Sequence, residues 1–143
     1  MKYYLAGRYD RREELKGYAD ELRALGHTVT SRWLLYGTHV LASDSKYYLD
    51  DGVPLAMSFF AQEDYEDIKA SDALVFFSEP LFFSEPPDTA SKRGGRHVEF
   101  GMALAWGKRL VIIGPRENVF HCLPQVERYR TWQEFIQHER SAR

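Results

Sequence analysis

Apolar and polar positions along this chain alternate between short β-type runs and helical periods, which is the pattern of an α/β protein. Two runs are almost wholly apolar, Lys2–Ala6 and Ala73–Phe77, as expected of parallel strands covered on both faces. Shorter runs predict three more strands, over Thr28 to Arg32 or Trp33, Leu110–Ile113 and Val126–Tyr129. Because crossovers between such strands are right-handed, the pattern predicts one domain over residues 1–143 with a three-layer, mostly parallel sheet.

Four helices are expected around this sheet, where apolar residues recur three or four positions apart. They are expected from Asp10 or Arg11 to about Leu25, after Ser58, over His97 to Trp106, and after Thr131, which has capping-box spacing to Glu134. The third is apolar on nearly every side, so we expect it at the centre of the fold. Residues 34–57 show no steady period and are interpreted as a loop or lid.

The carboxyl ends of parallel strands meet at one edge of the sheet, and ligands bind outside that edge. In this chain those ends lead into residues 7–12, 78–95 and 114–118. The middle segment is a long connection, and long connections in small domains are usually functional or mobile. We therefore expect the site near these three segments.

Composition narrows the classes of function. Lys and Arg number 19 against 21 Asp and Glu, a net charge of −2, whereas proteins that bind nucleic-acid polymers usually carry a basic excess. No apolar run reaches the roughly 18 residues that span a bilayer, and the N-terminus lacks the apolar stretch of a signal peptide. The single Cys122 excludes an intramolecular disulfide and a multi-cysteine zinc site, and the histidines form no metal set. We expect a soluble, cytoplasmic protein without metal, cofactor, membrane contact or nucleic-acid partner.

The strongest candidate for chemistry is Glu99, which follows Gly94 and Gly95 in the expected first turn of a helix. The helix dipole there favours an ionised carboxylate, and an acidic residue in a first turn is also a common stabilising choice. The apolar surroundings and the position at the sheet edge favour a partly buried carboxylate suited to nucleophilic attack or to stabilising a cation. We expect Gly101, inside this helix, to allow close packing against a strand.

Two further segments are weaker candidates. Asp64 and Asp67 are three apart, so they share a helix face that is either functional or simply a solvated acidic face. Gly7 ends a strand and is followed by Arg8, which suits an anionic or hydroxyl-rich ligand; the alternative is surface charge with a helix cap. The segment lacks the full glycine fingerprint of a dinucleotide site. Trp33 is either core or a stacking surface for a base.

The order of these motifs resembles the nucleoside 2-deoxyribosyltransferase family, with its related 2'-deoxynucleoside 5'-monophosphate N-glycosidases. The resemblance rests on Tyr4 to Gly7, on Asp64-(x3)-Ile68-(x2)-Ser71-Asp72 leading into the apolar strand, on Gly95-(x3)-Glu99-Phe100-Gly101 followed by Met-Ala-Leu-Ala, and on Gly107-Lys108-Arg109. It covers nearly the whole chain in the same order. It implies a flavodoxin-like or Rossmann-like fold that cleaves N-glycosidic bonds of nucleosides or nucleotides.

The resemblance also assigns roles to residues of this chain. It implies that Glu99 is the nucleophile and that Asp64 meets the nucleobase, with Asp67 as a less favoured substitute. It places the substrate against the end of the first strand. The residues matched there are Tyr4, Gly7, Arg8 and Tyr9. It further implies a homo-oligomer with shared active sites, in which Asn118 is lent to a neighbouring subunit.

One departure from the family concerns the substrate. The transferases often carry an acidic residue before the glycines, where this chain has Lys92 and Arg93, with Arg96 and His97 beyond Gly95. Cations beside a helix start suit a 5'-phosphate, although an exposed basic loop is the alternative.

We therefore expect a nucleoside 2-deoxyribosyltransferase, which passes a deoxyribosyl group through a covalent intermediate on Glu99 to another nucleobase or to water. Two alternatives are a 2'-deoxynucleoside 5'-monophosphate N-glycosidase and a non-catalytic nucleotide-binding module, since fold alone does not give function.

Overall fold

The computed structural model describes residues 1–35, 46–79 and 94–142. These form a five-stranded sheet in the order β2-β1-β3-β4-β5, in which every pairing is parallel. The strands are β1 (Lys2–Ala6), β2 (Thr28–Val29), β3 (Ala73–Phe77), β4 (Arg109–Ile113) and β5 (Val126–Tyr129). This is the flavodoxin-like strand order, so the expected α/β class and parallel sheet are confirmed.

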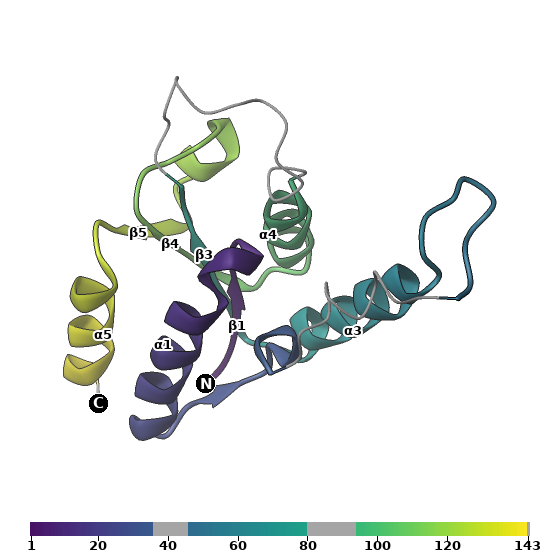
Figure 1. Cartoon of the computed structure of the whole chain (residues 1–143). Coiled ribbons are helices and arrows are strands. Elements are labelled where there is room, and N and C mark those ends of the chain that lie inside the picture. The colour runs from purple at the N-terminus through teal and green to yellow at the C-terminus, as the bar shows by residue number, and fades with distance from the viewer. Residues whose placement is uncertain (36–45, 80–93, 143) are drawn as a thin grey trace.

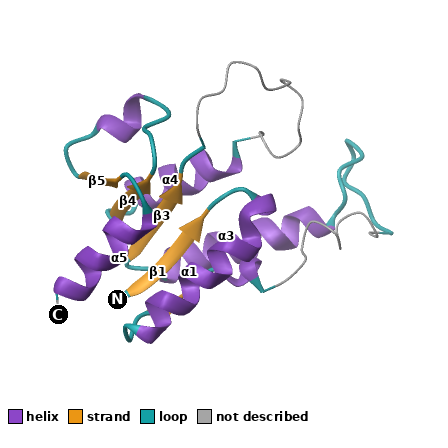
Figure 2. Cartoon of the chain, turned by 60° about the vertical axis from the view of Figure 1, so that its left-hand side comes forward, coloured by secondary structure: helices purple, strands orange, loops and turns teal. Residues whose placement is uncertain are grey.

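Among the described residues, four α-helices complete a three-layer arrangement (Figures 1 and 2). They are α1 (Arg12–Ala24), α3 (Ala56–Ala70), α4 (Gly95–Ala105) and α5 (Trp132–Ser141). Helices α1 and α5 lie on one face of the sheet, and α3 and α4 lie on the other. In the described part of the chain, no helix has the length and apolar character needed to cross a bilayer.

The core lies on both faces of β1, β3 and β4. All five residues of β3 are buried, which explains why the strand has no polar position. On one face, the Tyr18 ring of α1 stacks against the rings of Phe77 and Trp132, at 5.6 and 4.4 Å between centroids, and these two rings also contact each other at 5.9 Å. This stack joins α1, β3 and α5 into one layer.

Three strands and the last helix lie where the sequence placed them. The Thr131 hydroxyl accepts a hydrogen bond from the backbone N–H of Glu134 at 3.2 Å, which confirms the expected cap of α5. The reciprocal bond differs from a full capping box, because the Glu134 carboxylate accepts from the N–H of Arg130 instead.

The second strand was predicted too long. It ends at Val29, and Arg32–Leu34 form a 3-10 helix. The chain leaves the sheet here because it forms hydrogen bonds with two other elements. The Asp67 carboxylate of α3 accepts from the Arg32 backbone N–H at 2.9 Å, and the Trp33 indole N–H donates to the Leu5 carbonyl of β1 at 2.9 Å. Neither contact is visible in local sequence.

Two helix starts also differ from the prediction. Helix α3 begins at Ala56 rather than after Ser58, and part of the expected lid, residues 36–45, lies outside the described residues. Helix α4 begins at Gly95, directly after Gly94 in a left-handed conformation (φ 82°). Glu99 therefore lies in the second turn of α4, not the first, and the dipole argument for its charge weakens.

The expected roles of two glycines change as well. A Cβ atom on Gly101 would meet no atom within 4 Å, so close packing within the chain does not explain this glycine. A Cβ atom on Gly7 would lie 2.6 Å from a methyl group of Leu15, so Gly7 is the position where a strand end and α1 pack closely. Helix α4 is also less central than expected, since Val98 is 64% exposed on its outer face.

Candidate active site

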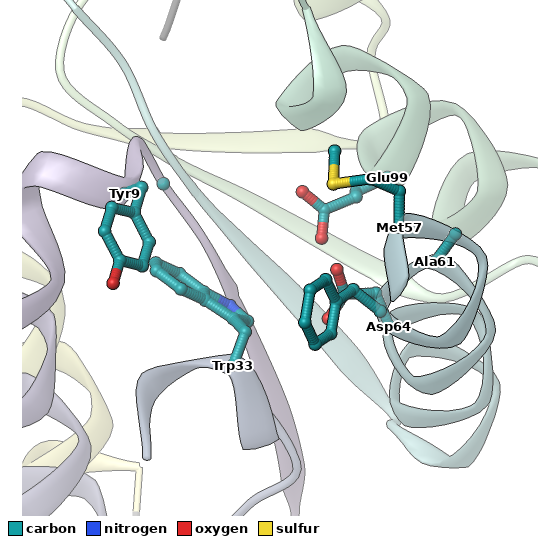
Figure 3. A pocket seen from close by; sticks show the side chains of 8 residues that line it. Tyr9, Trp33, Met57, Ala61, Asp64 and Glu99 are labelled. Carbon is teal, nitrogen blue, oxygen red and sulfur yellow. The ribbon is translucent and has the colours of Figure 1, made fainter. Parts of the chain in front are cut away.

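A cavity of about 210 Å³ lies beyond the carboxyl end of β1, where the strand order reverses between β1 and β3 (Figure 3). Doubly wound sheets bind ligands at such switch points. Its lining residues are Gly7, Tyr9, Trp33, Met57, Phe60, Ala61, Asp64 and Glu99. Tyr9 and Trp33 form one side, and residues of α3 and α4 form the other.

Helix α3 presents one continuous stripe to this cavity. Met57, Phe60, Ala61 and Asp64 are spaced at three and four residues, so they share a helix face. Sequence reasoning singled out only Asp64 among them as functional. Extending the same spacing backwards from Asp64 would have found the other three, but the expected helix start after Ser58 excluded Met57.

Two carboxyl groups face the cavity from neighbouring helices, Asp64 from α3 and Glu99 from α4. The hydroxyl of Tyr4, a fully buried residue of β1, donates a hydrogen bond to the Glu99 carboxylate. In the described part of the chain, neither carboxyl group forms an ion pair with an arginine or lysine side chain. Both carboxyl groups are therefore desolvated without an ion pair to a described cation, and Arg32 and Arg96 act on them only through longer-range attraction.

This environment raises both proton affinities. Desolvation by the surrounding protein raises the pKa of Glu99 to about 8, against a smaller lowering effect of the Tyr4 hydrogen bond. Desolvation, followed by the negative charges of Asp67 and Glu63, raises the pKa of Asp64 to about 7. Near neutral pH the pair can therefore hold one proton. One carboxyl group can then be ionised and attack, while the other is protonated and donates.

Several predicted site residues meet in this cavity. Glu99, Asp64, Gly7, Tyr9 and Trp33 all line it. Tyr4 does not line the cavity, but its hydroxyl binds the lining residue Glu99. The Tyr9 ring is supported by Arg12, whose guanidinium lies 4.8 Å from the ring centroid and donates to the Tyr9 hydroxyl at 2.6 Å.

Other predicted residues lie elsewhere. Asp67 is buried and turned toward Arg32 rather than into the cavity. Arg96 donates to the Glu117 carboxylate at 2.7 Å and to the Phe77 carbonyl at 3.1 Å. Arg8 does not line the cavity and pairs with Asp10 at 3.2 Å.

His97 and Asn118 contact each other at 3.2 Å and line a separate hollow of about 460 Å³ on the outer side of α4. Gly95 is the exposed first residue of that helix. Lys92 and Arg93 lie outside the described residues. Contacts of these residues with a substrate therefore stay predictions.

No protein-family model and no curated protein matches the chain. Among solved structures, Clostridium botulinum CMP N-glycosidase BcmB aligns over 99% of both chains, with 17% identity and a TM-score of 0.57. A 2-deoxyribosyltransferase from Bacillus psychrosaccharolyticus aligns over 95% of this chain and 90% of its own, with 21% identity and a TM-score of 0.62. The chain shares their fold. The fold expected from the sequence resemblance is thus confirmed, and the activity must be argued from the site.

Proposed function

We propose that this protein cleaves the N-glycosidic bond of a 2'-deoxynucleoside, with Glu99 as the nucleophile. The observation that carries the proposal is the pair of desolvated carboxyl groups, Glu99 and Asp64, on the walls of one small cavity at the switch point of the sheet. The two solved structures of the same fold are a CMP N-glycosidase and a 2-deoxyribosyltransferase, which supports chemistry at a glycosidic carbon.

The reaction needs the state in which Glu99 is ionised and Asp64 holds the shared proton. Because the pKa of Glu99, about 8, lies above that of Asp64, about 7, this is the less populated of the two singly protonated states of the pair. The ionised Glu99 attacks the sugar C1' atom, and the bond from C1' to the base nitrogen breaks through an oxocarbenium-like transition state. The bonding electrons pass to the base, which takes a proton from Asp64 because it leaves poorly as an anion. The product is an ester between C1' and Glu99. A second base or a water molecule then attacks C1' and gives its proton to the Asp64 carboxylate, while the bond from C1' to Glu99 breaks and frees the Glu99 carboxylate.

Tyr4 and the aromatic wall assist this chemistry in different ways. The Tyr4 hydroxyl binds one Glu99 oxygen, which favours the ionised form and leaves the other oxygen for attack. Tyr9 and Trp33 offer ring surfaces to a base on the opposite side. The volume of about 210 Å³ is below the roughly 300 Å³ of sites for drug-sized ligands, so it suits one nucleoside rather than a polymer.

The deciding experiment is an assay for free base and for exchanged nucleoside. The protein is incubated with each 2'-deoxynucleoside, with and without a second base. Free base alone identifies a hydrolase, and a new nucleoside identifies the transferase, which is the expected result. Binding without either product, in the wild type and in Glu99→Gln alike, would reject catalysis and leave a nucleotide-binding module.

A 5'-monophosphate N-glycosidase is the second candidate, because one structure of this fold acts on CMP according to its name. The structure favours Arg8 over Arg96 as the residue that would bind a 5'-phosphate. Arg96 pairs with Glu117 away from the cavity. Arg8 also pairs with an acidic residue, Asp10, but it is the chain neighbour of the lining residues Gly7 and Tyr9. If phosphate binds, the monophosphate should be preferred, and Arg8→Ala should reduce this preference by roughly tenfold or more, as for one charge-assisted bond of about 1.5–3 kcal/mol. Arg96→Ala is the matched comparison.

The proposal includes a homo-oligomer with shared active sites. Helix α4 directs its charged residues inward, and its outer face leaves Val98 64% exposed beside Phe120, 60% exposed, around the apolar hollow of about 460 Å³. Gly101 lies in this hollow without an intrachain reason for a glycine. The close approach of a second copy of the chain to this hollow accounts for a glycine at this position. Sedimentation of Val98→Asp should show monomers where the wild type shows oligomers.

A further inference from the structure

One ion pair joins the two sides of the candidate active site. The Arg32 backbone N–H donates to one Asp67 carboxylate oxygen at 2.9 Å, and the Arg32 Nε–H donates to the other at 2.7 Å. Asp67 is only 5% exposed. The Thr30 hydroxyl adds a third link, since it donates to the Asp67 carbonyl at 2.9 Å. The segment after β2 is thereby attached to the C-terminal turn of α3.

Each partner of this pair is adjacent to a cavity residue. Arg32 directly precedes Trp33, whose ring forms one side of the cavity, and Asp67 lies one helical turn after Asp64 on the other side. Trp33 is held from a second direction by its indole bond to the Leu5 carbonyl. The distance between the Trp33 ring and the Asp64 carboxyl group therefore depends on the Arg32–Asp67 contact.

We propose that the Arg32–Asp67 ion pair is a positioning element of this site: it sets the spacing between Trp33 and Asp64 and places one charge of each sign beside Asp64. The inference rests on the proposed function for its catalytic meaning, and its geometric part stands on the contacts alone. It gives Asp67, expected from sequence as a substitute base-binding residue, a supporting role.

The pair also affects how Asp64 holds its proton. The groups that face Asp64 are Tyr4 from β1, Glu99 from α4, Glu63 and Asp67 from its own helix, and Arg32 from the 3-10 helix. Among them, the negative charge of Asp67 raises the pKa of Asp64 and the positive charge of Arg32 lowers it. Removing one partner or the other should therefore shift this pKa in opposite directions, which mere loosening of the fold would not do.

The test is an NMR titration of the Asp64 side-chain carboxyl carbon in three variants. Asp67→Asn should lower the Asp64 pKa, and Arg32→Met should raise it, each by on the order of one unit as expected for a neighbouring charge. Glu66→Gln is the matched control. Glu66 also contacts Arg32, at 3.3 Å, but its side chain is 56% exposed, so this variant should leave the titration unchanged.

A fourth variant separates spacing from charge. Arg32→Lys keeps the charge and the backbone donor but loses the Nε–H contact, so the Asp64 pKa should stay near its wild-type value while the Trp33 indole N–H resonance shifts. Its kcat/KM should fall by about tenfold or more, since misplacement by about 1 Å can cost about a hundredfold. If Arg32→Met fails to fold, Arg32→Lys is the Arg32 variant in which the Trp33 resonance is measured.

The inference is overturned if Asp67→Asn and the folded Arg32 variant leave both the Asp64 titration and the Trp33 resonance unchanged, or if Glu66→Gln shifts them equally. The NMR measurements need no turnover. If the wild type releases no base while Asp67→Asn lowers and Arg32→Met raises the Asp64 pKa, the proposed function is rejected and the positioning role is kept.

Discussion

Two faces of one sheet bury neighbouring tyrosines of β1 against carboxylates, with opposite electrostatic results. Successive strand residues point to opposite faces, so Tyr3 meets Glu139 of α5 at 2.6 Å, and Tyr4 meets Glu99 of α4. On the first face Arg109 is also present. Its guanidinium donates to Glu127 at 2.6 and 2.8 Å and to Glu139 at 2.7 Å.

Arg109 explains the difference. Burial raises the pKa of Glu139, but hydrogen bonds from Arg109 and Tyr3 outweigh it and leave this pKa below its usual range. Glu99 has the tyrosine without the arginine, and its pKa rises to about 8. The same residue types thus lower the pKa of a carboxyl group on one face and leave the pKa raised on the other.

The largest expected effect comes from removing the nucleophile. Glu99→Gln keeps the shape of the side chain but cannot form the ester, so kcat should fall by a factor of about a thousand or more. Single-turnover release of base measures this, and mass spectrometry of the trapped wild type should detect a deoxyribosyl adduct. Turnover within about tenfold of the wild type would remove Glu99 from this role.

The same variant tests the electrostatic contrast through stability. Because the folded pKa of Glu99 lies above its unfolded value, the cost of its ionisation accumulates as pH rises from about 4.5 and is complete above about 8. At pH 9 the free energy of unfolding of Glu99→Gln should therefore exceed that of the wild type by about 2 kcal/mol or more, since one pKa unit corresponds to about 1.4 kcal/mol. Denaturant titration measures this difference. The difference should vanish at pH 4.

Next in size is the loss of the proton donor. Asp64→Asn should lower kcat/KM by about a hundredfold or more for poor leaving groups. Bases that leave readily as anions need no proton, so their turnover should suffer much less. The decline in wild-type activity above about pH 8, where the pair loses its last proton, should disappear. An equal loss for all leaving groups would contradict the assignment. Asp67→Ala losing more than Asp64→Ala would transfer the role by one helical turn.

The opposite face predicts a change in stability without a change in chemistry. Arg109→Met leaves the 6%-exposed Glu139 without its cation, which should reduce the free energy of unfolding by about 3–5 kcal/mol at pH 7. Because the Glu139 pKa is lowered in the fold, the loss should shrink as pH falls below about 4.5. Denaturant titration measures it. Activity per folded molecule should match the wild type.

The smallest effects come from the two tyrosines, which form a matched pair. Tyr4→Phe removes a bond that lowers the Glu99 pKa, so activity at pH 7 should fall by about tenfold, as for one bond to a charged group. Tyr3→Phe removes a bond to Glu139 and should cost about 1 kcal/mol of stability with no loss of activity. Equal losses of activity in both variants would erase the contrast between the faces.

Much of the fold was predictable because the relevant forces are local. The all-apolar run Ala73–Phe77 is a strand covered on both sides, and Thr131 followed by Glu134 starts the last helix as predicted. The 3-10 helix at Trp33 was not predictable, because Asp67 and Leu5 bind this segment from other layers. For the same reason helical spacing alone could not separate Asp64 from Asp67, which differ in what faces them, and only the family resemblance favoured Asp64.

By itself, the sequence determined the order of strands and helices, and it placed Glu99 and Asp64 on helices beside the carboxyl ends of parallel strands, because periodicity and topology suffice for that. Only the tertiary structure decided which carboxyl groups exchange protons near neutral pH. A pKa depends on desolvation and on charges brought from distant segments. Tyr4 and Glu99 are 95 residues apart, as Arg109 and Glu139 are 30 apart. Packing alone pairs Glu139 with an arginine, whereas Glu99 forms no ion pair with any arginine in the described part of the chain.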